Sequence, residues 1–220
     1  MDCTEAAIPT PASPTNAPAG HTARLCVLGS GSRGNCSVLH TVDPDGTSSV
    51  TLIDLGFSPR MTARMLAEAG LSLEAVDAVL LTHLDHDHCH LGWNAPDALP
   101  RSAQVFLHEG HLQRAYSRGL NGGRLQPFHG QRGKPGEAFS TSDRRHLAVR
   151  PLMTFHDDLG AAVFHITIGN AVDAPAIGYA TDLGRVTDEL ITHLRSDVIG
   201  GASSGRSGGG GGGGEGSISS

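Results

Sequence analysis

The sequence has no apolar run long enough to span a membrane and no recognisable secretory leader. No segment approaches the ~20 apolar residues that a spanning helix needs. Residues 1–22 have neither a basic start nor a long apolar stretch, so they are not a signal peptide. The cysteines are few and form no CxxC pair. We therefore expect a cytoplasmic protein with reduced thiols at Cys3, Cys26, Cys36 and Cys89.

Hydrophobic residues are also scarce, at 38% of the 220 residues. The two ends account for much of this deficit. Residues 1–22 are rich in Pro, Ala and Thr without an apolar period, and residues 200–220 are a Gly/Ser-rich low-complexity tail. Neither composition supports a packed core, so we expect a disordered first tail and a coil at the end. One domain of medium size is predicted over residues 23–199.

The net charge of −6 argues against wholesale coating of nucleic acid, but the charges are unevenly spread. Residues 101–150 contain nine Lys or Arg against three acids, which gives that segment a net charge near +6. The segment is either ordinary solvated surface or a basic face that receives a phosphate-bearing substrate. The candidates for such a face are Arg124, Arg132, Lys134, Arg144 and Arg145.

One short segment concentrates metal-ligating side chains. His83-Leu84-Asp85-His86-Asp87-His88 offers five ligands in six residues, directly after the apolar run 78–82, which predicts a buried strand. Imidazole and carboxylate groups suit Zn²⁺, and mixed sets also suit Mn²⁺ or Fe²⁺. The alternative is a solvated polar loop, but unpaired charges beside a core strand are costly. The segment therefore predicts a metal site.

The spacing His-x-Asp-x-Asp-His resembles the His-x-His-x-Asp-His signature of the metallo-β-lactamase family, with Asp85 at the place of the second His. The resemblance implies an α/β (α+β) αββα sandwich with a two-metal site at one end. His83, Asp85 and a downstream His would hold the first metal. Asp87, His88, a bridging Asp and a last His would hold the second. His86 is the alternative to Asp85.

Two later segments extend the resemblance. His156 follows the strand expected over residues 146–155, where family members place a His of the first metal. Thr181-Asp182-Leu183-Gly184 resembles the family's Thr-Asp-x-Gly, whose Asp bridges both metals. The resemblance gives these roles to His156 and Asp182, whereas a simple turn is the alternative at Asp182.

The glycine-rich segment 29–34 matches GxGxxG, with Asp54 twenty residues further on. A dinucleotide site requires a helix after these glycines, but residues 35–39, 43–46 and 49–53 predict a hairpin instead. We therefore reject a dinucleotide-binding domain.

Residues 29–35 and 52–56 read Gly-Ser-Gly-Ser-Arg-Gly-Asn and Leu-Ile-Asp-Leu-Gly. Both resemble the WalJ/YycJ-like group of the family, whose members are DNA exonucleases. The resemblance implies that Asp54 lies below the metals and orients a ligating His, a role with a sound physical basis. Turn capping is the alternative. Ser30, Ser32 and Asn35 form the expected substrate loop, in which free backbone N–H groups could position a phosphate.

The expected activity is hydrolysis of DNA phosphodiesters, exonuclease-like, by hydroxide that two divalent metals generate. Zn²⁺ is favoured, with Mn²⁺ or Fe²⁺ as alternatives. Asp87 and Asp182 are the catalytic candidates, DNA is the expected partner, and neither a membrane nor a protein partner is expected. The alternatives are hydrolysis of another ester, lactone or thioester, or an inactive metal-binding fragment.

The fragment alternative comes from the C-terminal end. The composition changes to poly-Gly at residue 200, within a strand expected from Asp197. Family members continue there with a Glu-Ser-Asn segment, the last metal-binding His and the closing strands. We therefore expect a truncated or frame-shifted chain and a sandwich that is incomplete at its C-terminus.

The remaining elements follow from local patterns. Ser58 and Pro59 predict a helix start, and Gly70 predicts its end after Ala69. Residues 119–136, rich in Gly and Arg, predict a substrate-side loop, and surface positions are expected for His108 and His111. The other expected strands are 24–28, 104–108, 161–168 and 175–181, and the other expected helices lie near 90 and over 109–118 and 187–195.

Overall fold

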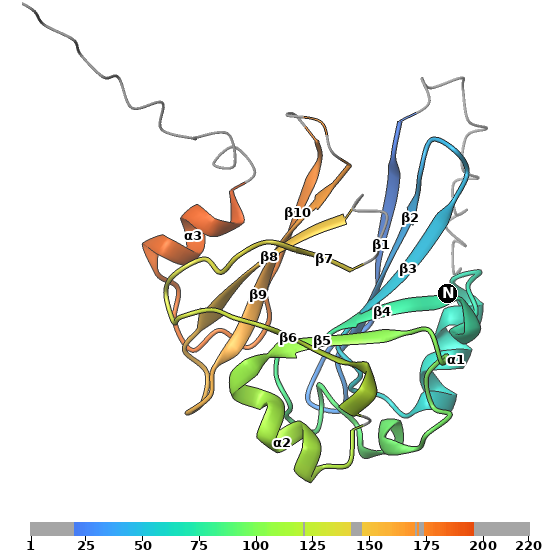
Figure 1. Cartoon of the computed structure of the whole chain (residues 1–220), viewed down its shortest axis with the longest axis horizontal. Coiled ribbons are helices and arrows are strands. Elements are labelled where there is room, and N and C mark those ends of the chain that lie inside the picture. Colours follow the sequence, from blue (N-terminus) through green and yellow to red (C-terminus); the bar gives the residue numbers. More distant parts are fainter. Residues whose placement is uncertain (1–19, 121, 142–146, 170, 172–173, 196–220) are drawn as a thin grey trace, which may run out of the picture.

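The computed structural model describes residues 20–120, 122–141, 147–169, 171 and 174–195. Two β-sheets lie face to face, with helices on their outer sides (Figure 1). The predicted tails, residues 1–22 and 200–220, fall outside the described residues, except for residues 20–22. The strand predicted from Asp197 also falls outside them. No helix in the described part of the chain is long and apolar enough to cross a bilayer.

The larger sheet has six strands in the order β1-β2-β3-β4-β5-β6. Its first three strands pair antiparallel, whereas β3 through β6 pair parallel. Parallel pairing brings the carboxyl ends of β3, β4 and β5 to one edge, where ligand sites gather in such sheets. The strands are Thr22–Gly29 (β1), Cys36–Val42 (β2), Ser48–Ile53 (β3), Val76–Leu80 (β4), Gln104–His108 (β5) and Leu125–Phe128 (β6).

The smaller sheet has four antiparallel strands in the order β10-β9-β8-β7. Its long central pair, β8 and β9, is joined to the larger sheet by the hydrogen bond from Ala162 N to Thr82 O, 2.8 Å long. That bond anchors the smaller sheet beside the end of β4. The strands are Phe139–Ser140 (β7), Leu147–Thr154 (β8), Ala161–Ile168 (β9) and Ala176–Tyr179 (β10).

The helices are short. Those of α type are Pro59–Glu68 (α1), Leu112–Ser117 (α2) and Asp188–Leu194 (α3). Turns of 3-10 type are Leu73–Ala75 (η1), Leu91–Asn94 (η2), Glu109–His111 (η3) and Gly122–Arg124 (η4).

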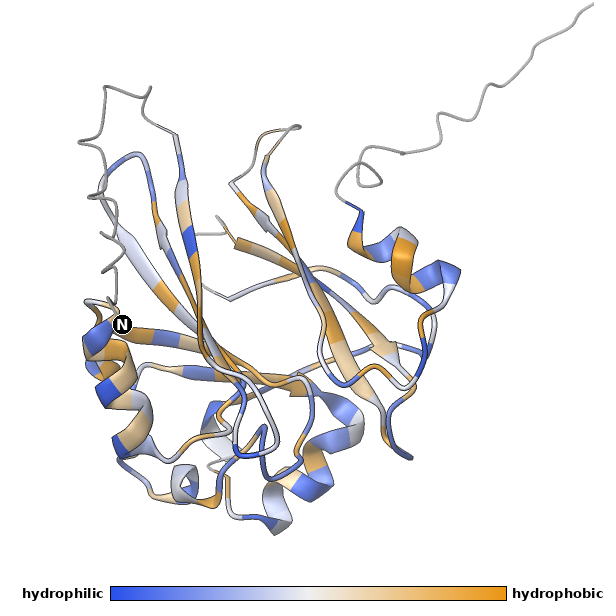
Figure 2. Ribbon diagram, turned by 180° about the vertical axis from the view of Figure 1, so that it is seen from behind, coloured by the Kyte–Doolittle hydropathy of each residue, from blue (hydrophilic) through white to orange (hydrophobic). Residues whose placement is uncertain are grey.

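Side-chain alternation along the strands builds two main cores. On β4, Ala78 and Leu80 pack between the sheets, whereas Val79 packs toward α1 and α2. Phe164 on β9 is the largest fully buried side chain between the sheets. A third, smaller cluster seats Leu190 of α3 on the outer face of the smaller sheet. In Figure 2 hydrophobic residues concentrate along the strands, while the helices carry hydrophilic residues on one side. The layers are thus α, β, β and α.

The capping signals of α1 act as the sequence predicted. The Ser58 hydroxyl accepts a hydrogen bond from Met61 N, and Pro59 occupies the first turn. At the other end Gly70 has φ +78°, and Leu71 N donates to Leu66 O at 2.9 Å. This left-handed glycine satisfies the last carbonyls of the helix.

Most predicted strands are confirmed. Two strands of the structure were not predicted, one inside the segment expected to be a substrate-side loop and one just beyond it. β6 falls inside residues 119–136, hidden in the sequence by Pro127, which an edge strand tolerates. β7, of only two residues, had no sequence signal. The helix predicted near His90 is a 3-10 turn, and the one predicted over 109–118 divides into η3 and α2.

The surface position predicted for His111 is wrong. Its side chain is buried, and Nε2 donates to the carbonyl of Gly160, which closes the β8–β9 connection. Burial lowers the pKa of His111 to about 4, although the bond to Gly160 opposes the shift. The imidazole is therefore neutral in the folded protein near neutral pH.

This neutral histidine predicts a loss of stability on acidification. Between pH 6.5 and 4 the unfolded chain binds a proton at residue 111 that the folded chain does not, so stability falls as pH falls. His111→Gln keeps a donor for Gly160. Denaturant titrations should show a shallower pH dependence for this variant, by up to about 1.4 kcal/mol per pH unit. Identical pH profiles would contradict a buried neutral His111.

Gly56 lies where three segments meet. A Cβ at this position would approach Asp87 O to 1.9 Å and Asn35 N to 2.3 Å. These are backbone atoms held by hydrogen bonds, including Gly56 N to Asn35 O and Asn35 N to Asp87 O. A side chain here would therefore push the glycine-rich loop away from the segment that follows β4.

We predict that Gly56→Ala destabilises the protein by about 3 kcal/mol or more through overpacking, measured by chemical unfolding. Gly130→Ala is the matched control, because its Cβ would meet only Met153 Cγ at 3.7 Å. Equal stability of the two variants would show that the junction is not tightly packed.

Candidate metal centre

The polar side chains singled out in the sequence converge at one edge of the sandwich. Asp54 follows β3, the segment 83–88 follows β4, His156 follows β8 and Asp182 follows β10. Two sets of potential ligands result, each with its ligand atoms within 4.8 Å of one another. The first is His83, Asp85 and His156, and the second is His83, His88 and Asp182.

The first set has the spacing of a metal site. Asp85 Oδ2 lies 3.7 Å from His83 Nε2 and 3.5 Å from His156 Nε2. Ligand atoms about 2.05 Å from a tetrahedral Zn²⁺ are about 3.3 Å apart, so these three atoms need to move little to share an ion. The rings of His83 and His156 meet edge to face, with centroids 4.7 Å apart. The residues present therefore fit a divalent metal.

The geometry favours Asp85 over His86. His86 is exposed, and its ring lies beside that of His90, with centroids 5.4 Å apart. Asp85 instead faces the cluster and also receives a hydrogen bond from Arg114 Nη2 at 2.9 Å. Burial would raise the pKa of Asp85, but the bonded Arg114 and the nearby His83 hold the pKa below its ordinary value. The carboxylate is thus available as an anionic ligand.

The second set centres on His88. Its Nε2 lies 2.5 Å from Asp182 Oδ2 and 3.7 Å from Asp87 Oδ2. An imidazole lone pair and a carboxylate oxygen repel at 2.5 Å unless a proton or another cation lies between them. Asp182 must also move outward before both atoms can bind one metal ion.

The buried carboxylate of Asp54 orients both His83 and His88. Asp54 accepts hydrogen bonds from Thr82 N at 2.8 Å, from Thr82 Oγ1 at 2.9 Å and from His88 Nδ1 at 2.7 Å. Since the Thr82 hydroxyl donates to Asp54, it accepts from His83 Nδ1, 3.0 Å away. Both imidazoles therefore carry a proton on Nδ1 and turn Nε2 toward the cluster. Asp54 thus fixes the ring of His88 directly and that of His83 through Thr82.

The two imidazoles differ in proton affinity. Burial and the neighbouring His88 lower the pKa of His83. Burial would also lower the pKa of His88, but the bonded carboxylate of Asp54 and the nearby Asp182 raise it instead. Without a metal, a proton on His88 therefore relieves the contact with Asp182.

The glycine-rich loop positions Asn35. Its side-chain nitrogen lies 3.2 Å from Asp87 Oδ2 and 3.0 Å from His88 Nε2. Its oxygen accepts from Gly31 N and from Ser30 Oγ. Gly34 N donates to Gly31 O. The backbone N–H groups of Gly31 and Gly34 are therefore already bonded inside the loop and are not free to position a phosphate. Ser30 and Ser32 remain exposed.

Only part of the predicted basic face is available for a substrate. Arg124 donates to the carbonyls of Leu99 and Pro100, so its role is to hold the chain before β5. Arg132 donates to the carbonyls of Asp157 and Asp158. Lys134 is exposed, whereas Arg144 and Arg145 lie outside the described residues.

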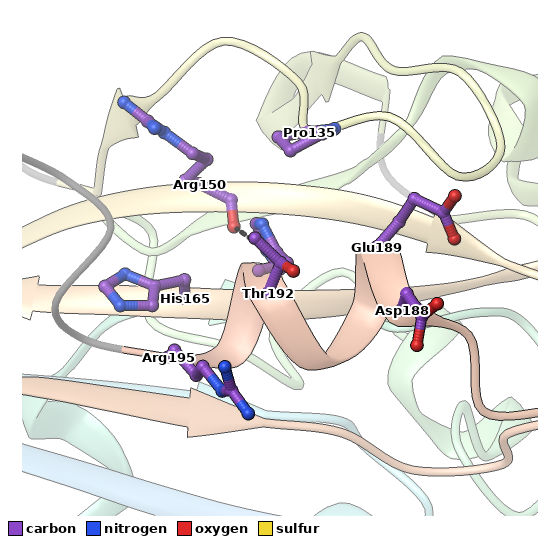
Figure 3. A pocket seen from close by; sticks show the side chains of 8 residues that line it. Pro135, Arg150, His165, Asp188, Glu189, Thr192 and Arg195 are labelled. Atoms are coloured by element: carbon purple, nitrogen blue, oxygen red, sulfur yellow. Dashed lines mark hydrogen bonds between the residues drawn. The ribbon is translucent and has the colours of Figure 1, made fainter. Parts of the chain in front are cut away.

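A separate cavity of about 390 Å³ lies between α3 and the smaller sheet (Figure 3). His165 lines it, buried and with neither ring nitrogen hydrogen-bonded to a described residue, while His193 Nε2 donates to Arg150 O. Neither imidazole belongs to the two ligand sets. The guanidinium groups of Arg150 and Arg195 point apart (Figure 3). This cavity therefore lacks a convergent group for catalysis.

Sequence reasoning missed the residues that support the ligands. Thr82 is the last residue of the predicted strand 78–82 and gave no chemical signal. Arg114 and Arg118 were counted only as charges. Their spacing of four residues indicates only that they share one face of a helix, and not which segment that face meets.

Comparisons with known proteins address the fold. Residues 29–100 match the model of the metallo-beta-lactamase superfamily. A comparison with curated proteins gives no match. Among solved structures, human tRNase Z, short form, is similar with a TM-score of 0.51 and 13% identity, over 77% of this chain and 73% of that one.

Two β-lactamase structures are also similar. A subclass B3 metallo-beta-lactamase from a soil metagenome library has 20% identity and a TM-score of 0.45, over 67% of this chain. One from Novosphingobium pentaromativorans has 16% identity and a TM-score of 0.47, over 73% of this chain. The matched part spans 57% of the former and 63% of the latter. The superfamily match over residues 29–100 and the architecture shared with tRNase Z show that this chain has the metallo-β-lactamase fold.

Proposed function

We propose that this protein is a metal-dependent hydrolase that cleaves phosphodiesters. The observation that carries the proposal is the pair of ligand sets that meet at His83, at the ends of strands from both sheets. Catalytic hydrolase sites combine imidazole and carboxylate ligands with an accessible position for water. Here Asp85 and Asp182 are about one-third exposed, whereas His83 and His88 are buried beneath them.

Each residue has a stated role in the proposal. His83, Asp85 and His156 would hold the first metal, Asp87 and His88 would hold the second, and Asp182 would be shared by both. Two such ions, favoured as Zn²⁺ with Mn²⁺ or Fe²⁺ as alternatives, would supply Lewis-acid chemistry, which polarises a phosphoryl oxygen and lowers the pKa of a water toward ~7. The protein orients these ligands and accepts protons at exposed carboxylates, for which Asp87 and Asp182 are the candidates.

Charge at the rim supports an anionic substrate. The Arg185 guanidinium lies over the Phe155 ring, 4.1 Å from its centroid, and Arg132 lies 5.6 Å from the same centroid. Phe155 directly precedes His156, so both cations lie against the segment that carries a proposed ligand. Cations beside a metal pair favour phosphate-bearing substrates.

DNA is the proposed substrate, and exonuclease action the proposed mode, on the basis of the motif at 29–35. The neighbour named tRNase Z shares the fold at 13% identity, which is compatible with a nucleic-acid substrate. The fold alone does not choose among substrates. The proposed location is the cytoplasm.

Substitution of single ligands should remove metal. We predict that His83→Ala, His88→Ala and Asp182→Ala each lower bound Zn²⁺ sharply, measured by metal analysis after dialysis. Asp85→Asn should weaken binding more than His86→Ala, since only Asp85 faces the cluster. The reverse order would transfer the ligand role to His86. Wild-type metal content in all three alanine variants would sink the site assignment.

Activity can be tested with end-labelled DNA oligonucleotides and Zn²⁺ or Mn²⁺. We expect stepwise shortening that a chelator stops and that Asp182→Ala reduces at least a hundredfold. The exposed Arg64→Ala variant on α1 is the control and should keep full activity. If metal-loaded protein hydrolyses a lactam or thioester but leaves DNA intact, the phosphodiester proposal is wrong.

A further inference from the structure

The helix α2 holds the metal-binding segment from one side. Arg114 lies on α2, and Arg118 follows four residues later at its end. Arg118 Nη1 donates to Leu84 O, and Arg114 Nη2 donates to Asp85 Oδ1 at 2.9 Å. Two guanidinium groups from one helix face thus fix two consecutive residues of the segment that follows β4.

The contact with Arg114 gives the two carboxylate oxygens of Asp85 different partners. Oδ1 is bonded to the guanidinium, while Oδ2 points between His83 Nε2, at 3.7 Å, and His156 Nε2, at 3.5 Å. A carboxylate with one oxygen engaged in this way presents the other as a single ligand atom. An imidazole at the same position would also present one atom.

Arg114 also reaches the second ligand-bearing segment. Its Nη1 lies 3.7 Å from Asp157 Oδ2, directly after His156. Asp157 Oδ1 in turn accepts from Gly160 N and Leu159 N, so this turn is internally fixed. One half-buried guanidinium therefore joins the segment after β4 to the segment after β8.

The positive charge of Arg114 beside Asp85 would affect the chemistry of a bound metal. Asp85 adds a negative charge where the family signature has a neutral imidazole. The adjacent guanidinium offsets that charge, so a metal bound there would keep the electron-withdrawing character that it has with neutral ligands.

We propose that Arg114 is a positioning residue that makes Asp85 act as a single-oxygen metal ligand in place of a histidine. The inference rests on the proposed metal centre, but not on the proposed substrate. A surface ion pair of no consequence and a substrate-phosphate contact are the competing roles for Arg114.

A double-mutant cycle separates these roles. The variants are Arg114→Ala, Arg114→Lys, Asp85→His and the pair Asp85→His with Arg114→Ala; Arg64→Ala is the control for losing a helical arginine from an ion pair. Zn²⁺ affinity is measured by competition with a chromophoric chelator, and ligand geometry by the visible absorption of the Co²⁺ protein.

We expect Arg114→Ala to weaken the first metal about ten- to hundredfold and to change the Co²⁺ spectrum. Arg114→Lys should recover part of the affinity. In the Asp85→His background, the same alanine substitution should cost less than about threefold, because a histidine needs no arginine to orient it. Arg64→Ala should match the wild type.

Four results would overturn the inference. Equal losses in both backgrounds would mean that Arg114 supports the fold and not Asp85. Unchanged metal affinity would leave a surface ion pair, and unchanged affinity with weakened DNA binding would make Arg114 a substrate contact. Wild-type protein that binds no metal would refute the metal centre and this inference together. Metal binding without DNA cleavage would contradict the proposed substrate alone, and the cycle would still decide the role of Arg114.

Discussion

The buried carboxylate of Asp54 is the group on which the arrangement of the centre depends. It is fully buried and accepts every hydrogen bond that Thr82 and His88 can direct toward it. An ionised carboxylate in such a place is tolerated only when fully hydrogen-bonded. Because these bonds fix Nδ1 of His88 directly and Nδ1 of His83 through Thr82, the Nε2 atoms of both imidazoles, which are the proposed ligands, turn toward the same cluster. Preorganisation of this kind raises metal affinity.

Backbone strain accompanies that arrangement. Asp54 and Asp182 are the non-glycine residues with positive φ among those described, at 65° and 48°. Left-handed backbone is costly for residues with a Cβ and persists where surrounding contacts enforce it. At Asp54 the bond from its own N to Leu80 O supplies such a contact, and at Asp182 the Thr181 hydroxyl donates to the carboxylate. Both strained residues are thus acids whose carboxylates contact His88, Asp54 at Nδ1 and Asp182 at Nε2.

Much of the clustering of the candidate ligands could be predicted, because these residues directly follow apolar strands. The strand pattern before His83 and the His-x-Asp-x-Asp-His spacing are local, so one sequence suffices to recognise them. The supporting contacts depend on tertiary packing instead. Nothing local to Arg114 indicates that it meets Asp85, 29 residues away, or that His111 is buried against Gly160. β6 and β7 escaped prediction for the same reason, since their pairing partners, not their own short sequences, make them strands.

The orientation of the two imidazoles is the central claim, and nitrogen-15 NMR of the histidine rings tests it most directly. In metal-free protein above neutral pH, His83 should show the Nδ1-protonated tautomer, and His88 should keep its Nδ1 proton whether neutral or charged. Addition of Zn²⁺ should shift the Nε2 resonances of both residues and leave both Nδ1 protons in place. Nε2-protonated tautomers, or Nε2 resonances that Zn²⁺ does not move, would contradict the claim.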